Sequence, residues 1–256
     1  MPIWLIPAFL GTALLYASVG FGGGSTYNAL LALAGVDYRV LPAIALTCNI
    51  IVVIGGTWRF HRAGLLPWRR ALPLVLVSAP FAGLGGLTPI TETAFLALLA
   101  TSLFVAGLAL LVQRERPLET APAQQDRKTG FADLLTGAGV GYLAGLVGIG
   151  GGIFLAPYLH MTRWAAAKQI AATASLFILI NSITGLAGQL GKLGSTGALP
   201  EVAGYWPLAL AVLIGGQIGA LVSSRLPDRL LKTVFGVAVL FIGIVYIFTA
   251  SKKLFF

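Results

Sequence analysis

Long apolar blocks, separated by short polar segments, run through the whole chain. They cover residues 3–35, 40–58, 71–90, 93–113, 131–161, 169–190, 204–224 and 230–251. A helix needs about 20 mostly apolar residues to cross the hydrocarbon core of a bilayer. With 57% hydrophobic and only 10% charged residues, the chain carries more apolar surface than a soluble domain of this length can bury. The pattern therefore predicts an all-α polytopic membrane protein with the lipid bilayer as its solvent.

The two halves of the chain share a glycine pattern. The most polar stretch, 113–130, is the predicted linker between a first repeat, 1–112, and a second repeat, 131–256. The glycines of "SVGFGGGSTY" (18–27) return in "LVGIGGGIFL" (146–155) at a shift of 128 residues, since 148 − 20 = 128. The same shift places Thr47 opposite Ser175. Motifs that match in this way indicate an old internal repeat.

Basic residues are distributed differently over the equivalent loops of the two halves. The loop after the first block carries Arg39 alone in the first half, but Arg163 and Lys168 in the second. At the next loop the first half is the more basic one, because residues 59–70 hold four arginines whereas the equivalent loop of the second half has Lys192 alone. Since Lys and Arg gather on the cytoplasmic side, equivalent loops are expected to face opposite sides of the membrane. The distribution predicts an inverted-topology repeat.

An inverted repeat needs an odd number of crossings in each half, although each half has four apolar blocks. We therefore expect the first block of each half to break at its glycines into two helical arms. These arms would enter and leave on the same side, as a re-entrant hairpin or a tight helical pair. Three spanning helices then follow in each half, and the linker lies on the cytoplasmic side.

The glycine runs are also the first candidate binding site. Glycine adopts positive φ without steric cost, so a GxGGG run is able to end one helix and begin another. The first amides of the new helix lack intrahelical partners and carry partial positive charge, a combination that binds anions. In the first half, the side chain of Ser25 or Thr26 is able to cap these amides. The alternative to a binding site is that the glycines only permit close helix packing. The predicted substrate-binding residues of the two runs are Gly22, Gly23, Gly24, Ser25, Asn28, Gly150, Gly151 and Gly152.

Uncharged polar residues within the apolar blocks extend this candidate site. Thr47 and Asn49 lie in "LTCNI" (46–50), and Ser175 and Asn181 lie in the equivalent block of the second half. Their hydroxyls and amides are able to donate hydrogen bonds to anionic oxygens, so all four are predicted to line the site. The alternative is that they only bond across helices.

Charged residues are predicted to lie at the ends of the blocks. All eight acids fall in loops or at block edges, which disfavours coupling through a carboxylate buried at mid-span. Arg59 and His61 are expected to anchor the second block at the interface; the alternative is an entrance that attracts anions. The acids are Asp37, Glu92, Glu115, Glu119, Asp126, Asp133, Glu201 and Asp228.

Other functions are disfavoured by what the sequence offers. The net charge of +9 comes from loops rather than from a basic soluble domain, so nucleic acid is not an expected partner. Cys48 is the single cysteine, which excludes an internal disulfide or a multi-cysteine metal site, and no cofactor is expected. No catalytic residues are assigned, and a membrane-embedded enzyme is the least favoured alternative. The expected partners are a small anion and the bilayer, and a homodimer is left open.

The paired glycine runs and the four-plus-four arrangement of blocks resemble the TauE/SafE family of sulfite and organosulfonate exporters. The most specific parts of the resemblance are "GLVGIGGGIFLAP" (145–157) and, in "AATASLFILINSITG" (171–185), Thr173, Ser175 and Asn181. The resemblance implies a multi-pass transporter of the bacterial inner membrane for small sulfur-containing anions, with export favoured. An anion-selective channel is the alternative. The first half departs from the pattern, because Ala29 stands where the second half has Pro157.

Overall fold

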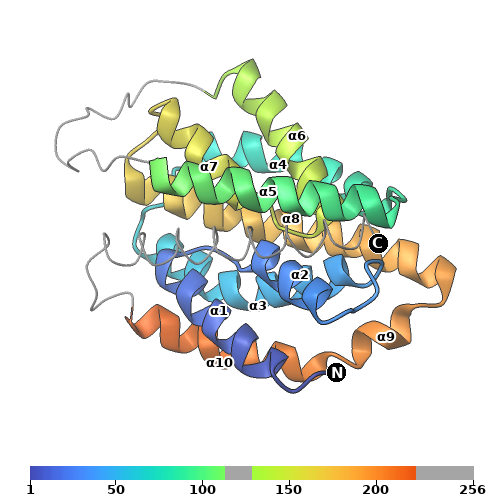
Figure 1. Ribbon diagram of the computed structural model, residues 1–256. Helices are drawn as coiled ribbons and strands as arrows, with labels where there is room; N and C mark the ends of the chain where they lie inside the picture. Colours follow the sequence, from blue (N-terminus) through green and yellow to red (C-terminus); the bar gives the residue numbers. More distant parts are fainter. Residues whose placement is uncertain (113–128, 223–256) are drawn as a thin grey trace.

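The described part of the chain is helical throughout its regular structure. The computed structural model describes residues 1–112 and 129–222 (Figure 1). The predicted last block, 230–251, and all of the linker except Thr129 and Gly130 lie outside these residues. The helices are α1 (Leu5–Val19), α2 (Gly24–Leu33), α3 (Leu41–Arg62), α4 (Trp68–Leu87), α5 (Glu92–Val112), α6 (Phe131–Val147), α7 (Gly152–Met161), α8 (Ala167–Thr196), α9 (Leu199–Ala203) and α10 (Trp206–Val222).

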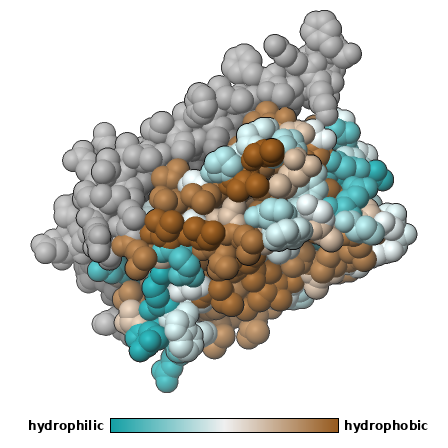
Figure 2. All heavy atoms as spheres, turned by 90° about the horizontal axis from the view of Figure 1, so that it is seen from below, coloured by the Kyte–Doolittle hydropathy of each residue, from teal (hydrophilic) through white to brown (hydrophobic). Residues whose placement is uncertain are grey.

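Several of these helices have the length and composition of membrane spans. α3, α4 and α8 are long and apolar enough to cross a bilayer, and shorter apolar helices accompany them. Figure 2 shows a broad apolar surface across the middle of one face, with hydrophilic residues gathered toward opposite ends. The expected polytopic helical membrane protein is thereby confirmed in its coarse form.

The chain interrupts its helix at both glycine runs. Gly20, with φ +84°, follows the last residue of α1, and Gly148, with φ +79°, follows the last residue of α6. α2 then runs back along α1, since the rings of Phe9 and Tyr27 stack with centroids 4.6 Å apart. α7 runs back along α6, where the Tyr158 hydroxyl donates to Asp133. Each glycine run is therefore the turn of a helical hairpin.

Helices of one half pack against helices of the other. α4 and α6 run side by side in the same direction, and a Cβ at Gly141 or Gly145 would overlap the backbone of Ser78 or Ala82. α1 and α10 do the same, as the two lowest long helices of Figure 1. Because glycine lacks a Cβ, these backbones approach closely. α3 and α8 lie between the two pairs and are antiparallel, since Thr57 contacts Ser175 whereas Leu46 lies near Gly185.

Most described basic residues lie at one end of the bundle, which we call the basic end. The Arg70 guanidinium at the start of α4 donates to the carbonyl of Trp164 and lies 4.3 Å from the Trp164 ring centre. Thr129, before α6, donates to the Arg70 carbonyl at 3.0 Å, so the starts of α4, α6 and α8 meet here. The basic end carries Arg59, Arg62, Arg69, Arg70, Arg163 and Lys168.

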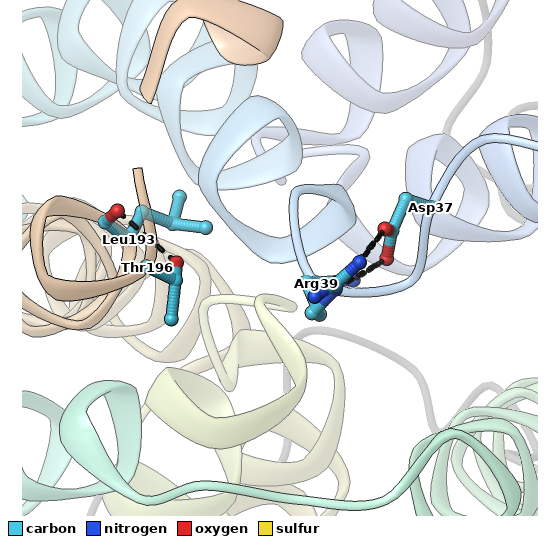
Figure 3. A network of polar contacts seen from close by, with 4 residues as sticks. All are labelled: Asp37, Arg39, Leu193 and Thr196. Carbon is cyan, nitrogen blue, oxygen red and sulfur yellow. Dashed lines mark hydrogen bonds and ion pairs between the residues drawn. The ribbon is translucent and has the colours of Figure 1, made fainter. Parts of the chain in front are cut away.

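The opposite end carries two described basic residues, Arg39 and Lys192. Arg39 pairs with Asp37 in the loop between α2 and α3, with Nη2 and Oδ2 2.6 Å apart (Figure 3). The hydrogen bonds from Arg39 lower the pKa of the Asp37 carboxyl. Lys192 donates to the Thr88 carbonyl at 3.4 Å.

The four acids within the described residues lie in loops or first helical turns, as expected. Asp133 is nevertheless fully buried in the first turn of α6, which the sequence does not reveal. Its carboxylate accepts from the Gly130 amide at 2.9 Å and from the Tyr158 hydroxyl at 2.8 Å. These donors satisfy an acid that would be costly to bury alone.

Candidate functional site

Asn49 lies where the two glycine turns meet. It is placed by α3, and its side chain is fully buried. A Cβ on Gly22 or Gly24 would overlap the Asn49 carboxamide, and a Cβ on Gly150 would lie 2.9 Å from Asn49 Nδ2. The carboxamide is thus enclosed by glycine backbone from both hairpins. Among the residues that the structure describes, neither Nδ2 nor Oδ1 of Asn49 has a hydrogen-bond partner.

Ser182 on α8 joins this cluster beside Asn49, next to the same Gly150 Cβ position. Its Oγ lies 3.1 Å from the position of a Gly150 Cβ, and it too is fully buried, with no hydrogen-bond partner in the described part of the chain. A buried polar group left without a partner costs about 1–3 kcal/mol. Asn49 and Ser182 together are therefore costly for the fold, which is typical of groups kept for function. We call Gly22, Gly24, Asn49, Gly150 and Ser182 the central cluster.

Asn28 ties the two hairpins together beside the central cluster. From the second turn of α2, its Nδ2 donates to the carbonyls of Val147 at 2.8 Å and Gly148 at 3.2 Å. These carbonyls belong to the last residue of α6 and to the residue that follows it, and they have no partner within the helix. Asn28 Oδ1 is buried and, within residues 1–112 and 129–222, has no hydrogen-bond partner. Asn28 therefore positions one turn against the other.

Two helix N-termini border the central cluster. α2 begins at Gly24 and α7 at Gly152, and neither has a side-chain cap. The expectation that Ser25 or Thr26 caps α2 is wrong, because both hydroxyls lie instead near the Tyr16 hydroxyl, at 3.4 and 2.7 Å. No acidic residue occurs in α2, α3, α7 or α8. The helix dipoles thus supply partial positive charge without a fixed negative charge beside it.

The remaining glycines of the two runs face elsewhere. A Cβ on Gly23 would meet Tyr27 and Thr12, and one on Gly151 would meet Phe177, Val140 and Ala144. A Cβ on Gly152 would overlap Ile178. Of the predicted glycines, the structure brings Gly22, Gly24 and Gly150 to Asn49.

Three other predicted residues make separate contacts. Thr47 donates to the Ala43 carbonyl of its own helix at 2.8 Å. Ser175 shares a 2.9 Å hydrogen bond with Thr57. Asn181 Oδ1 accepts from Ser78 at 2.9 Å, and its Nδ2 has no hydrogen-bond partner. The repeat pairs Thr47 with Ser175, whereas their hydrogen bonds go to different partners.

Arg59 and His61 lie in the last turn of α3, at the basic end. The His61 ring lies 5.9 Å from the Trp58 ring and 5.5 Å from the Trp68 ring, centre to centre. Trp58 is 61% exposed and Trp68 is 40% exposed. Exposed tryptophans beside basic residues are typical of the membrane interface, the position expected for this segment.

Ser182 is the residue of the central cluster that the sequence analysis missed. It follows Ser175 by two helical turns, since 182 − 175 = 7, and therefore lies on the same face of α8. Gln189, a further seven residues along, donates to the carbonyls of Gly145 at 2.8 Å and Leu146 at 3.3 Å. The heptad spacing of these three buried polar residues was the signal available.

The comparisons with known proteins cover both hairpins. The profile of the family described as Sulfite exporter TauE/SafE matches residues 5–246. The chain belongs to the TauE/SafE family. The resemblance seen in its glycine motifs is thereby confirmed.

Curated proteins similar to this family member bear related names. A "Probable membrane transporter protein y4hK" from Sinorhizobium fredii is 35% identical over 87% of this chain and 88% of its own length. A "Probable membrane transporter protein MJ0441" from Methanocaldococcus jannaschii is 23% identical over 94% of each chain. No solved structure matches. The chain is thus a multi-pass membrane transporter of the TauE/SafE family.

Proposed function

We propose that this protein is a secondary transporter of small anions, most favourably sulfur oxyanions or organosulfonates, in the bacterial inner membrane. The observation that carries the proposal is the central cluster. Two helix N-termini, the Asn49 carboxamide and the Ser182 hydroxyl meet in the buried interior, and the hydrogen-bond donors of both side chains are unused. Such donors are able to replace the hydration of a sulfite or sulfonate group.

An inverted repeat is part of the proposal. α3 and α8 are equivalent in the repeat and run antiparallel. A Cβ on Gly219 would overlap the Leu14 carbonyl and one on Gly85 the Tyr142 carbonyl, and these two carbonyls are related by the repeat shift, since 142 − 14 = 128. The concentration of Arg and Lys at one end gives the orientation, with the basic end in the cytoplasm. The hairpins then reach inward from opposite faces.

Alternating access is the mechanism that this packing supports. Asn49 is enclosed by glycine backbone from both hairpins, so a solute reaches it only if one of the turns moves. An anion-selective channel would need an opening that persists. Rocking of one half against the other exposes a central site to each side in turn, as inverted repeats allow. Export is the direction proposed, because the family description names exporters.

Transport into proteoliposomes tests the proposal. We expect the purified protein to move sulfite, taurine or sulfoacetate, and to be stabilised by at least one of these anions against heat. Asn49→Ala should lower transport at least about tenfold, because one hydrogen bond to a charged group is worth about 1.5–3 kcal/mol. Thr184→Val is the matched control, because Thr184 donates only to the Ile180 carbonyl of its own helix.

Two results would contradict the proposal. The first is that inorganic cations stabilise the protein against heat whereas sulfite, taurine and sulfoacetate do not. The second is an Asn49→Ala variant that transports as fast as the wild type. If the protein conducts anions passively and does not concentrate them, it is an anion-selective channel and not a secondary transporter.

A further inference from the structure

Two side-chain amides occupy the carbonyl end of α6. The Ala144 carbonyl accepts from the main-chain amides that follow the helix. The next four carbonyls, those of residues 145–148, each accept from a side chain. Gln189 Nε2 donates to the first two at 2.8 and 3.3 Å, and Asn28 Nδ2 donates to the last two at 2.8 and 3.2 Å. The carbonyls that a helix end leaves without intrahelical partners thus all have donors here.

The two amide side chains use only their donors. Asn28 on α2 and Gln189 on α8 are both fully buried. A carboxamide has two hydrogens, and each side chain directs them at two carbonyls of α6 and its turn. Asn28 Oδ1 and Gln189 Oε1 are left without a hydrogen-bond partner in the described part of the chain, at a cost in free energy. The side chains are thus arranged as donors to this helix end rather than as balanced polar contacts.

The capped end of α6 borders the central cluster. A Cβ on Gly24 would overlap Asn49 Nδ2 and would lie 3.0 Å from the Gly148 carbonyl oxygen. The carbonyl end of a helix carries about half a negative elementary charge. Left bare, this end would repel an anion held by Asn49 and would offset the positive ends of α2 and α7. The hydrogens donated by the two amides place positive partial charge beside these oxygens and weaken that repulsion.

The carbonyl end of α1, in the first hairpin, has no equivalent amides. The repeat shift of 128 residues places Ala156 opposite Asn28 and His61 opposite Gln189. An alanine side chain has no donor, and the exposed His61 ring lies beside tryptophan rings at the basic end. A Cβ on Gly20, which follows α1, would lie 3.1 Å from the Phe60 ring. The amides therefore occur at the helix end that borders Asn49.

We propose that Asn28 and Gln189 are positioning residues that make the central cluster selective for anions, because they cover the negative end of α6. This inference rests on the proposed function, since it assigns to the same site the groups that set its charge preference. Carbonyls at the C-terminal ends of broken helices are able to coordinate Na⁺ in transporters. The two amides occupy the oxygens that would otherwise suit a cation.

Substitutions that keep the size of these side chains and remove their donors test the inference. We expect Asn28→Leu and Gln189→Met to raise the half-saturating concentration of sulfite about three- to thirtyfold, with a smaller change in maximal rate. Sulfite carries one negative charge at mildly acidic pH and two at alkaline pH. Because Coulomb energy scales with the charge of the ligand, the rise relative to the wild type should be larger at alkaline pH. A role in folding alone would not produce this dependence on ligand charge.

Thr57→Val is the matched control for lost stability. It removes one buried interhelical hydrogen bond, of 2.9 Å to Ser175, away from the end of α6. It should lower the unfolding temperature as the amide variants do, but keep the half-saturating concentration within about twofold of the wild type.

The outcomes separate this inference from the proposed function. Suppose that the wild type transports sulfite and Asn49→Ala does not. If Asn28→Leu and Gln189→Met then keep the wild-type half-saturating concentration, or raise it equally at both pH values, the charge role of the amides is refuted and the central site stands. If Asn49→Ala matches the wild type, the proposed function itself fails.

Discussion

The two glycine turns use the same motif for different physical reasons. In the second turn, Gly148, Gly150 and Gly151 have φ of +79°, +74° and +82°, which side-chain-bearing residues rarely adopt. In the first turn Gly20 alone has positive φ; Gly22 and Gly24 are required instead because a Cβ would overlap Asn49. The second turn therefore needs glycine for its backbone, and the first needs it for its neighbour.

This difference predicts which of the two turns is able to accept a side chain or change its backbone conformation. At Gly22, where φ is not positive, the backbone of the first turn is accessible to other residues once the space beside Asn49 is released. The second turn is fixed by its own dihedral angles, and α7 continues from it with Pro157 in the helix. Substitutions in the two turns should consequently respond differently to a change at Asn49.

The largest effect is expected for Gly150→Ala. The substitution combines positive φ with contacts of 2.9 Å to Asn49 Nδ2 and Ile178 Cγ2, so backbone strain and overpacking add. We expect a loss of about 2–4 kcal/mol in the free energy of unfolding in detergent. Gly35→Ala has φ +73° and nothing within 4 Å, and should lose only the strain, about 1–2 kcal/mol. Equal losses at the two positions would show that the crowding at Gly150 is unimportant.

A smaller and conditional effect is expected for Gly22→Ala. Its Cβ would overlap the Asn49 carboxamide, so the single substitution should cost about 1–3 kcal/mol. In the double variant with Asn49→Ala most of this cost should disappear, because the crowding atoms are gone. In the double variant Gly150→Ala/Asn49→Ala, the crowding against Asn49 should disappear, but the backbone strain of positive φ should remain. Thermal unfolding of the three single variants, the two double variants and the wild type measures both couplings. Equal rescue of Gly22→Ala and Gly150→Ala by Asn49→Ala would contradict the difference between the two turns.

The smallest effect is expected in the loops that leave the hairpins. Arg163 has φ +49° and follows Gly35 by the predicted repeat shift, since 163 − 35 = 128. Glycine relieves the strain of positive φ, so Arg163→Gly should raise the free energy of unfolding by about 0.5–1 kcal/mol. Arg163→Ala is the control that removes the charge and keeps the strain. An Arg163→Ala variant as stable as Arg163→Gly would assign the gain to charge.

The sequence was informative wherever the cause is local. The helix interruptions at 20–24 and 148–152 follow from glycine dihedral freedom, and they occur where the pattern predicts them. The Leu14 and Tyr142 carbonyls, which pack against Gly219 and Gly85, differ in position by the 128 residues that separate the two glycine runs. Asn49 was predicted because its amide lies within an apolar block and is able to donate hydrogen bonds to anionic oxygens.

The features of the site that the sequence did not predict depend on tertiary contacts. Thr26 was expected near the amides of α2, but the Tyr16 hydroxyl lies 2.7 Å from it, a partner ten residues away on another helix. Thr47 and Ser175 match in the repeat, yet Thr47 bonds its own helix because an i−4 carbonyl is always within reach of a threonine. Ser182 was missed because its role depends on where the second turn ends, which sequence spacing does not give.

The most direct test of the central claim is to locate the bound anion. Selenite has the shape and charge of sulfite and scatters X-rays anomalously, so it marks its own position in a crystal of the transporter. We predict a selenium peak between the two glycine turns, within hydrogen-bonding reach of Asn49 Nδ2 and Ser182 Oγ. A fully occupied peak elsewhere, with none beside Asn49 in protein that transports selenite, would contradict the account.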